Sequence, residues 1–249
     1  MGEPMEEVSI DTLETTNNLS PDVFEFARNY QVEARDKAIK QNTIVFLETG
    51  SGKTLIAIML LRNYAYLLRK PSKSIAVFLV PTVVLVQQQA KALERYLDLS
   101  IGKYWGEMGV DFWDGSVWKQ ECLKHEVLMI WKFSLSGQFV LVMTPMILLN
   151  ALRHSFIKLE AMKVLIFDEC HNARGKHAYA CIMKEFYHPS LQAGVTCLPR
   201  IFGMTASPVK GKGVKIRSLF SLIKLCAQAD YACCLFRFKL FSRILEGDS

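Results

Sequence analysis

Short runs of apolar and β-branched residues alternate with longer stretches of helical character along most of the chain. The apolar runs are typical of strands buried on both faces, and they fall at 43–47, 75–80, 140–143, 164–167 and 201–204. The helical stretches fall at 53–68, 82–96, 146–153 and 177–187. This alternation predicts an α/β fold in which a mostly parallel sheet carries helices on both faces.

The polar motifs of the sequence mostly follow directly after a predicted strand. They begin after Leu47, Val80, Met143, Phe167 and Met204. Ligands of parallel α/β sheets bind at the carboxyl ends of the strands, which meet at one edge. We therefore expect these motifs to form one site.

The first motif, LETGSGKT at 47–54, joins a predicted strand to a predicted helix. Gly50 and Gly52 let the backbone curl so that its N–H groups point inward, and the helix N-terminus adds partial positive charge. The Lys53 ammonium would reach the β- and γ-phosphates of a nucleotide, and the Thr54 hydroxyl would hold Mg²⁺. The strict phosphate-loop pattern has glycine where Leu47 stands. A structural glycine turn is therefore the alternative, although the preceding strand and the acidic motif below favour nucleotide binding.

The acidic motif is VLIFDECHN at 164–172, where polar residues follow four apolar ones. Asp168 would help to hold Mg²⁺ against the phosphates, and Glu169 would accept a proton from the attacking water. His171 would sense the γ-phosphate. Without the phosphate loop, a solvated surface turn would be the better interpretation.

A further motif, MTASP at 204–208, follows the last predicted strand. The hydroxyls of Thr205 and Ser207 would bond to the acidic motif and couple the nucleotide to a second site. Taken alone, such a short motif is more often due to chance, and its weight comes from its order in the chain.

Composition adds limits to this picture. The 249 residues are 51% hydrophobic, which indicates a folded chain, and the net charge of +6 is compatible with nucleic acid but too small to establish it. Seven cysteines without a C-x-x-C pair indicate neither a disulfide framework nor a zinc site. The first 22 residues contain six acidic residues and no Lys or Arg, unlike a secretory signal. The sequence has no long apolar run without charges, so it predicts no membrane span. We expect a reduced compartment, the nucleus or the cytoplasm.

In this order, the motifs resemble those of superfamily 2 helicases of the DExD/H-box kind, with further matches in VPTVVLVQQQ (80–89) and VMTPMILL (142–149). Three stretches are similar to the N-terminal helicase region of plant Dicer-like endoribonucleases, with the second paralogue type as the best match; they are GKYWGEMGVDFWD (102–114), KVLIFDECHNARGKH (163–177) and LPRIFGMTASPVKGKG (198–213). The resemblance implies a RecA-like P-loop domain that uses ATP and Mg²⁺ and acts on double-stranded RNA in RNA silencing.

The resemblance also implies roles for individual residues. ATP would be held by Gln31, which would contact the adenine, and by the loop residues Leu47, Glu48, Thr49, Gly50, Ser51, Gly52, Lys53 and Thr54. The RNA backbone would be contacted by Pro81, Thr82, Thr144 and Pro145. Each of these prolines would equally suit the first turn of a helix.

The chain departs from the family in several segments. We expect a flexible acidic segment at 1–22, the RecA-like domain at 23–210 with an apparent insertion at 128–139, and a divergent basic and apolar tail at 211–249. Within that tail, residues 225–245 would have no evolved role, or would form a basic amphipathic helix on a membrane or partner.

The sequence ends soon after the MTASP motif, without the family's second RecA-like domain or ribonuclease III segments. The second domain would supply an arginine finger, worth ~10³–10⁵ in rate, so ATP hydrolysis is expected to be slow and no ribonuclease activity is expected. The alternatives are a catalytically inactive nucleotide- and RNA-binding isoform and a non-functional fragment.

Overall fold

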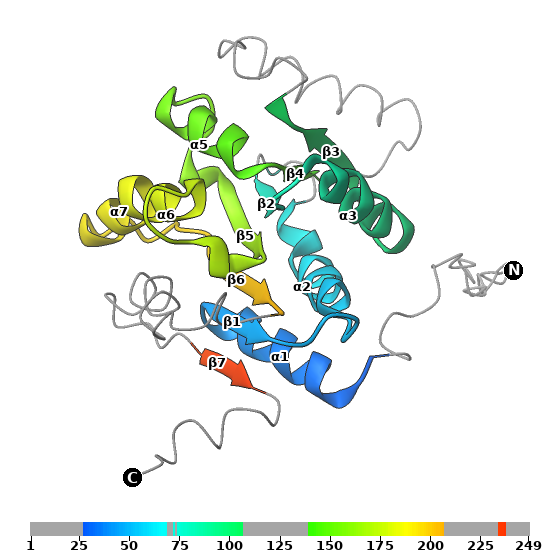
Figure 1. Ribbon diagram of the computed structural model, residues 1–249. Coiled ribbons are helices and arrows are strands. Elements are labelled where there is room, and N and C mark those ends of the chain that lie inside the picture. The colour runs from blue at the N-terminus through cyan, green and yellow to red at the C-terminus, as the bar shows by residue number, and fades with distance from the viewer. Residues whose placement is uncertain (1–26, 69–71, 73, 107–138, 207–233, 238–249) are drawn as a thin grey trace, which may run out of the picture.

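A computed structural model describes residues 27–68, 72, 74–106, 139–206 and 234–237. Its centre is a seven-stranded sheet in the order β3-β4-β2-β5-β6-β1-β7, and every neighbouring pair of strands is parallel (Figure 1). The strands are β1 (Thr43–Phe46), β2 (Ile75–Leu79), β3 (Ser100–Tyr104), β4 (Phe139–Met143), β5 (Met162–Asp168), β6 (Arg200–Thr205) and β7 (Cys234–Arg237).

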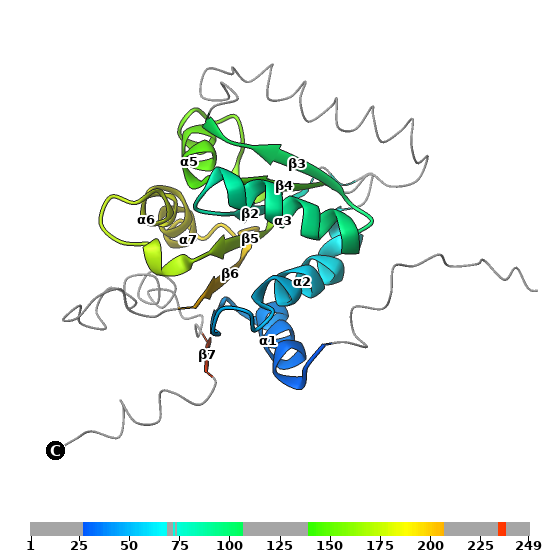
Figure 2. The same ribbon diagram turned by 45° about the vertical axis from the view of Figure 1, so that its right-hand side comes forward.

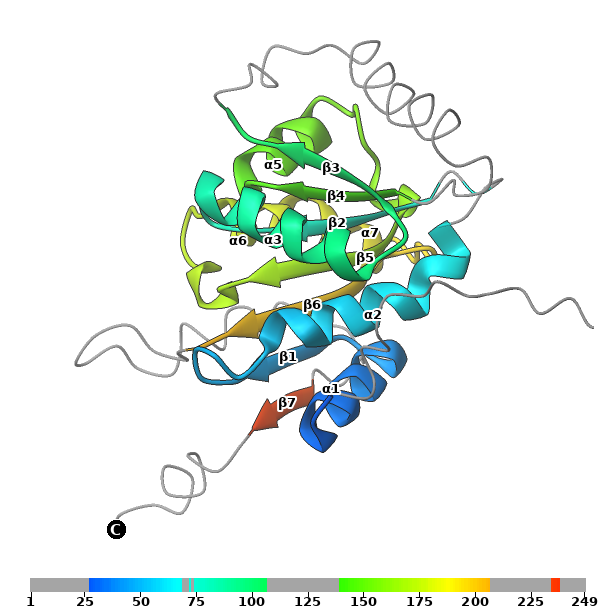
Figure 3. The same cartoon turned by 90° about the vertical axis from the view of Figure 1, so that its right-hand side faces the viewer.

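Helices cover both faces of the sheet, as the sequence predicts (Figures 2 and 3). One face carries α1 (Asn29–Lys40), α2 (Lys53–Leu68) and α3 (Val83–Tyr96). The other carries α5 (Pro145–Arg153), α6 (Ala178–Ile182) and α7 (His188–Gln192). The π-helical segment η5 (Met183–Tyr187) joins α6 to α7, and the short 3₁₀ helices η3 (Leu159–Ala161) and η4 (Cys170–Asn172) flank β5.

The strands have two apolar faces because their side chains alternate between the two helical layers. In β1, Ile44 packs into the core beside α5, α6 and α7, whereas Val45 packs into the core beside α1, α2 and α3. Burial of each such side chain stabilises the fold by about 1.5–3 kcal/mol. A strand in this position has no polar face, which is why the predicted strands read as continuous apolar runs.

The predicted elements are found close to their expected bounds, and α2 covers the predicted residues 53–68. The predicted helix at 177–187 runs on through η5 and α7 to Gln192. Pro189 lies at the start of α7, directly after the π-helical segment η5.

One α-helix and two strands were not predicted, namely α1, β3 and β7, and neither were the short 3₁₀ helices η3 and η4. Strand β7 lies within the expected tail and pairs with β1 from Thr43↔Cys234 to Phe46↔Arg237. The amphipathic-helix interpretation of the tail is therefore wrong for residues 234–237. The expected insertion lies outside the described residues except for Phe139, which begins β4.

No helix in the described part of the chain is long and apolar enough to cross a membrane.

Candidate nucleotide site

The loop between β1 and α2 has the backbone curl that the sequence predicts. Gly50 and Gly52 adopt φ angles of +82° and +79°, a conformation that favours glycine. A Cβ atom on Gly52 would lie 2.3 Å from Nε2 of Gln31, so any side chain here would have to displace the Gln31 amide. Leu47 is buried, whereas Glu48, Thr49 and Gly50 are exposed. The loop is thus anchored at its start and open to solvent at its tip.

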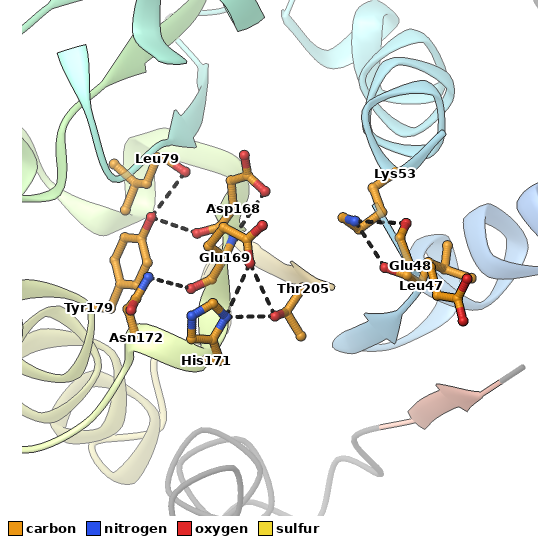
Figure 4. A network of polar contacts seen from close by, with 10 residues as sticks. All are labelled: Leu47, Glu48, Lys53, Leu79, Asp168, Glu169, His171, Asn172, Tyr179 and Thr205. Carbon is orange, nitrogen blue, oxygen red and sulfur yellow. Dashed lines mark hydrogen bonds and ion pairs between the residues drawn. The ribbon is translucent and has the colours of Figure 1, made fainter. Parts of the chain in front are cut away.

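The Lys53 ammonium bonds to the loop that precedes it. Its Nζ donates to the backbone carbonyls of Leu47 at 2.9 Å and Glu48 at 3.1 Å. In Figure 4 the side chain extends from α2 toward the side of the site on which Asp168 and Glu169 lie. The ammonium is near enough to lower the pKa of Asp168 electrostatically. Because β1 and β5 are both parallel neighbours of β6, the loop that carries Lys53 and the acidic motif lie at the same edge of the sheet.

Gln31 and Tyr30 tie α1 to the phosphate loop. The Gln31 amide donates to the carbonyl of Ser51 at 2.9 Å, and its Oε1 accepts from the backbone N–H of Arg28. The Tyr30 hydroxyl donates to the same Ser51 carbonyl at 2.7 Å. Gln31 is only 3% exposed and both ends of its amide are bonded within the protein, so here it supports the loop, and its contact with adenine stays a prediction.

Asp168 ends β5 as a buried carboxyl group, 6% exposed. Burial and repulsion by the Glu169 carboxylate raise the pKa of Asp168 to about 6, although the N–H of Glu169, which donates to Oδ1 at 2.9 Å, and the Lys53 ammonium act in the opposite direction. Glu169 has a φ of +46°, which is uncommon for a residue with a side chain. Backbone strain of this kind gathers at functional sites.

Three side chains form a compact polar cluster next to the acidic strand end (Figure 4). Nδ1 of His171 lies 2.7 Å from the Thr205 hydroxyl and 3.1 Å from Oε2 of Glu169. The Thr205 hydroxyl donates to the same Glu169 oxygen at 3.3 Å. The predicted contact between the end of β6 and the acidic motif is thus present for Thr205. Ser207, its predicted companion, lies outside the described residues.

Tyr179 and Gln89 are two polar residues of this region that the sequence did not reveal. The buried Tyr179 hydroxyl, on α6, donates to the carbonyl of Asp168 at 2.8 Å and contacts that of Leu79 at 3.3 Å. It joins the ends of β5 and β2. Gln89, on α3, accepts a hydrogen bond from the Thr54 hydroxyl at 3.1 Å. A polar residue on the buried stripe of an amphipathic helix was the signal that could have singled out Gln89.

The four predicted RNA-contact residues follow β2 and β4, which are neighbours in the sheet. The Thr82 hydroxyl caps α3 by accepting from the N–H of Leu85 at 3.4 Å, and it is exposed. Thr144 precedes α5 without capping it through its side chain. Pro81 is partly exposed, whereas Pro145 is buried in the first turn of α5, so Thr144 presents more surface than its neighbour.

The donor set suits Mg²⁺ bound together with phosphate oxygens. Among the described residues, no three His, Cys, Asp or Glu side chains gather into a metal site. Mg²⁺ needs no such cage, because it keeps several waters and usually takes one or two carboxylates and the substrate phosphates. The Thr54 hydroxyl and the buried Asp168 carboxyl fit this coordination, and a cation would offset the charge repulsion at Asp168.

The sequence matches a protein-family model and is similar to several known proteins. The DEAD/DEAH box helicase family model matches residues 28–211. The sequence is 64% identical over 210 residues to Endoribonuclease Dicer homolog 2 of Arabidopsis thaliana, and 55% identical over 194 residues to Endoribonuclease Dicer homolog 2b of Oryza sativa subsp. japonica. These matches cover 84% and 77% of the chain but only 14% and 13% of the two relatives.

The fold is also similar to a solved structure, the Hef helicase domain of Pyrococcus furiosus. The TM-score is 0.61 at 25% sequence identity, and the match covers 84% of this chain and 38% of the other. The predicted RecA-like α/β architecture and the resemblance to plant Dicer-like helicase regions are therefore confirmed.

Proposed function

The chain belongs to the DEAD/DEAH box helicase family, and from this premise we propose that it is the Mg-ATP-binding first RecA-like domain of a Dicer-like helicase that acts on double-stranded RNA in RNA silencing. The observation that carries the proposal is the convergence of the curled loop, Lys53, Asp168 and Glu169 at the carboxyl ends of β1 and β5. The identities to plant Dicer homologues support the RNA substrate.

The phosphate loop would bind the triphosphate by an exchange of partners. Lys53 now donates to two carbonyls of its own loop, and in the complex it would donate to the β- and γ-phosphates instead. The positive φ angles of Gly50 and Gly52 curl the backbone, and the N–H groups of residues 50–54 would bind the phosphate oxygens at the start of α2. Gln31 would contact the adenine while its amide continues to support the loop.

The acidic motif would orient the metal and the attacking water. Bound Mg²⁺ supplies charge neutralisation on the phosphates, and Thr54 and Asp168 would hold it. Glu169 would accept the proton of the water. His171 and Thr205, which contact Glu169 and each other, would transmit the state of the site to the end of β6.

We expect slow ATP turnover by the 249-residue chain assayed alone. The resemblance assigns the arginine finger to a second RecA-like domain, and loss of that group costs ~10³–10⁵ in rate. The nearest alternative is a module that binds nucleotide and RNA without catalysis. It would bind Mg-ATP through the same residues and would differ only in not hydrolysing it.

Thermal unfolding with and without Mg-ATP tests the nucleotide site. A ligand that binds only the folded state at 100 times its Kd stabilises it by about 2.7 kcal/mol, so Mg-ATP should raise the melting temperature of the wild type. Lys53→Ala should abolish the rise. Lys184→Ala removes an exposed lysine on the sheet face that carries α5, α6 and α7, and Mg-ATP should still raise the melting temperature of this variant. A rise that persists in Lys53→Ala would place the nucleotide elsewhere.

Binding to an RNA duplex tests the second ligand. The wild type should prefer double-stranded RNA over a DNA duplex of the same sequence, and the affinity should fall with salt. Thr144→Val keeps the size of the side chain and removes a hydroxyl that has no capping role, so it should weaken binding. Thr82→Ser keeps the cap of α3 and should bind like the wild type. Equal affinity for both duplexes would refute the proposed substrate.

A further inference from the structure

Gln89 is a buried amide on the apolar side of α3. The buried residues of this helix are Val86, Gln89, Ala90 and Leu93, so a glutamine stands where the pattern calls for an apolar side chain. It is 9% exposed. A buried amide without a partner costs a few kcal/mol, and Gln89 avoids this cost by accepting a hydrogen bond from Thr54.

The direction of this hydrogen bond determines what Thr54 offers to the site. A threonine hydroxyl has one proton and two lone pairs. The proton of Thr54 is donated to Oε1 of Gln89 at 3.1 Å. The lone pairs of Thr54 Oγ1 are therefore left for a cation, and the hydroxyl is held in one orientation before the ligand arrives.

We propose that Gln89 is a positioning residue for the metal site: by accepting the Thr54 proton, it holds the Thr54 oxygen ready to ligate the Mg²⁺ of a bound Mg-nucleotide. The inference rests on the proposed function, since it requires Thr54 to be a metal ligand. Outer partners of metal ligands fix the orientation of the ligand, and their loss costs typically 10–100-fold in metal affinity.

The location of Gln89 gives this bond a second consequence. The helix begins after Thr82, an expected RNA contact, and Gln89 lies seven residues further along it, a distance of about 10 Å at 1.5 Å per residue. Helices α2 and α3 pack directly against each other. A shift of α3 on RNA binding would move the acceptor relative to Thr54, so the affinity for the metal would depend on the position of the helix.

The test is a Mg²⁺ titration of the full chain with a fluorescent ATP analogue, compared with binding of the same analogue in EDTA. Gln89→Met keeps the length of the side chain and removes the acceptor. It should lower the apparent Mg²⁺ affinity about 10–100-fold and change the affinity for the analogue in EDTA less than about twofold. Gln89→Glu, which can only accept, should bind Mg²⁺ at least as tightly as the wild type.

Controls separate this role from a structural one. Gln87→Leu removes an exposed amide from the same helix and should leave the titration unchanged. In a Thr54→Val background, Gln89→Met should have no further effect on Mg²⁺ affinity, because the group that it orients is gone.

A Gln89→Met titration equal to that of the wild type would overturn the inference, and so would an equal loss in Gln89→Met and Gln89→Glu. Failure of the wild type to bind the analogue with or without Mg²⁺ would instead overturn the proposed function.

Discussion

Replacing Asp168 with asparagine is expected to stabilise the ligand-free protein at neutral pH and to abolish its stabilisation by Mg-ATP. Asparagine keeps the volume of the side chain and the oxygen that accepts from the N–H of Glu169. The change removes a buried charge whose pKa is about 6 in the folded protein and 3.8 in the unfolded reference. At 1.36 kcal/mol per pH unit, this difference corresponds to about 3 kcal/mol.

The effect has a defined dependence on pH. Because the folded pKa lies above the unfolded one, the folded state binds more protons between pH 3.8 and about 6, and its stability falls as the pH rises through this window. Below pH 3.8 the carboxyl group is protonated in both states, and the variant and the wild type should differ little. The difference should grow through the window and reach its full size at neutral pH.

Thermal unfolding at several pH values measures this difference. For a domain of this size about 3 kcal/mol corresponds to roughly 6–12 °C in melting temperature. Glu160→Gln removes an exposed carboxylate and serves as the control, with little change expected. If Asp168→Asn is no more stable than the wild type at pH 7.5, or if the difference does not change between pH 4 and 7, the carboxylate is not destabilising and the reasoning fails.

Further predictions concern the elements that support the site. Tyr179→Phe removes the buried donor to the Asp168 carbonyl and should lower the free energy of unfolding by about 1–3 kcal/mol in urea titrations. Gly52→Ala should lower the free energy of unfolding by about 2–4 kcal/mol, because the new Cβ would displace the Gln31 amide at a position with positive φ. Gly50→Ala also has a positive φ but has open space around it, so it should cost only about 1–2 kcal/mol. Equal costs would show that the contact with Gln31 is unimportant. Thr205→Val should reduce the effect of double-stranded RNA on nucleotide affinity and leave nucleotide binding without RNA nearly unchanged, as measured by titrating the ATP analogue with and without RNA.

The parts of the fold that the sequence predicts are those with a dense apolar pattern. Residues 53–68 are almost entirely apolar because α2 packs under the sheet beside α1 and α3, and the predicted bounds match. Helix α1 was missed because only Gln31, Ala34 and Ala38 are buried in it, so its buried side consists of small or polar residues. Strand β3 was missed because Ser100–Tyr104 contains glycine and lysine and lies at the edge of the sheet.

The same limit applies within the site. The curl of the loop and the acidic end of β5 follow from residue types at fixed positions after a strand, and these could be placed without coordinates. The hydrogen-bond partners of a side chain could not be predicted from the sequence. The sequence shows an ammonium at 53 but not the loop carbonyls that it binds, and it shows a tyrosine at 179 but not the strand ends that its hydroxyl joins.

These partners explain why ligand binding and stability should be linked in this protein. The site contains a buried carboxyl group beside a second acid, a residue with a positive φ at Glu169, and a lysine that donates to its own loop. Mg²⁺ would relieve the first of these costs, and phosphate oxygens would replace the carbonyl partners of the lysine at little net cost, because one set of charge-assisted bonds replaces another. The affinity for Mg-ATP would thus come in part from instability already present in the empty site. A substitution that stabilises the empty site, such as Asp168→Asn, removes that contribution, so greater stability and loss of function should appear together.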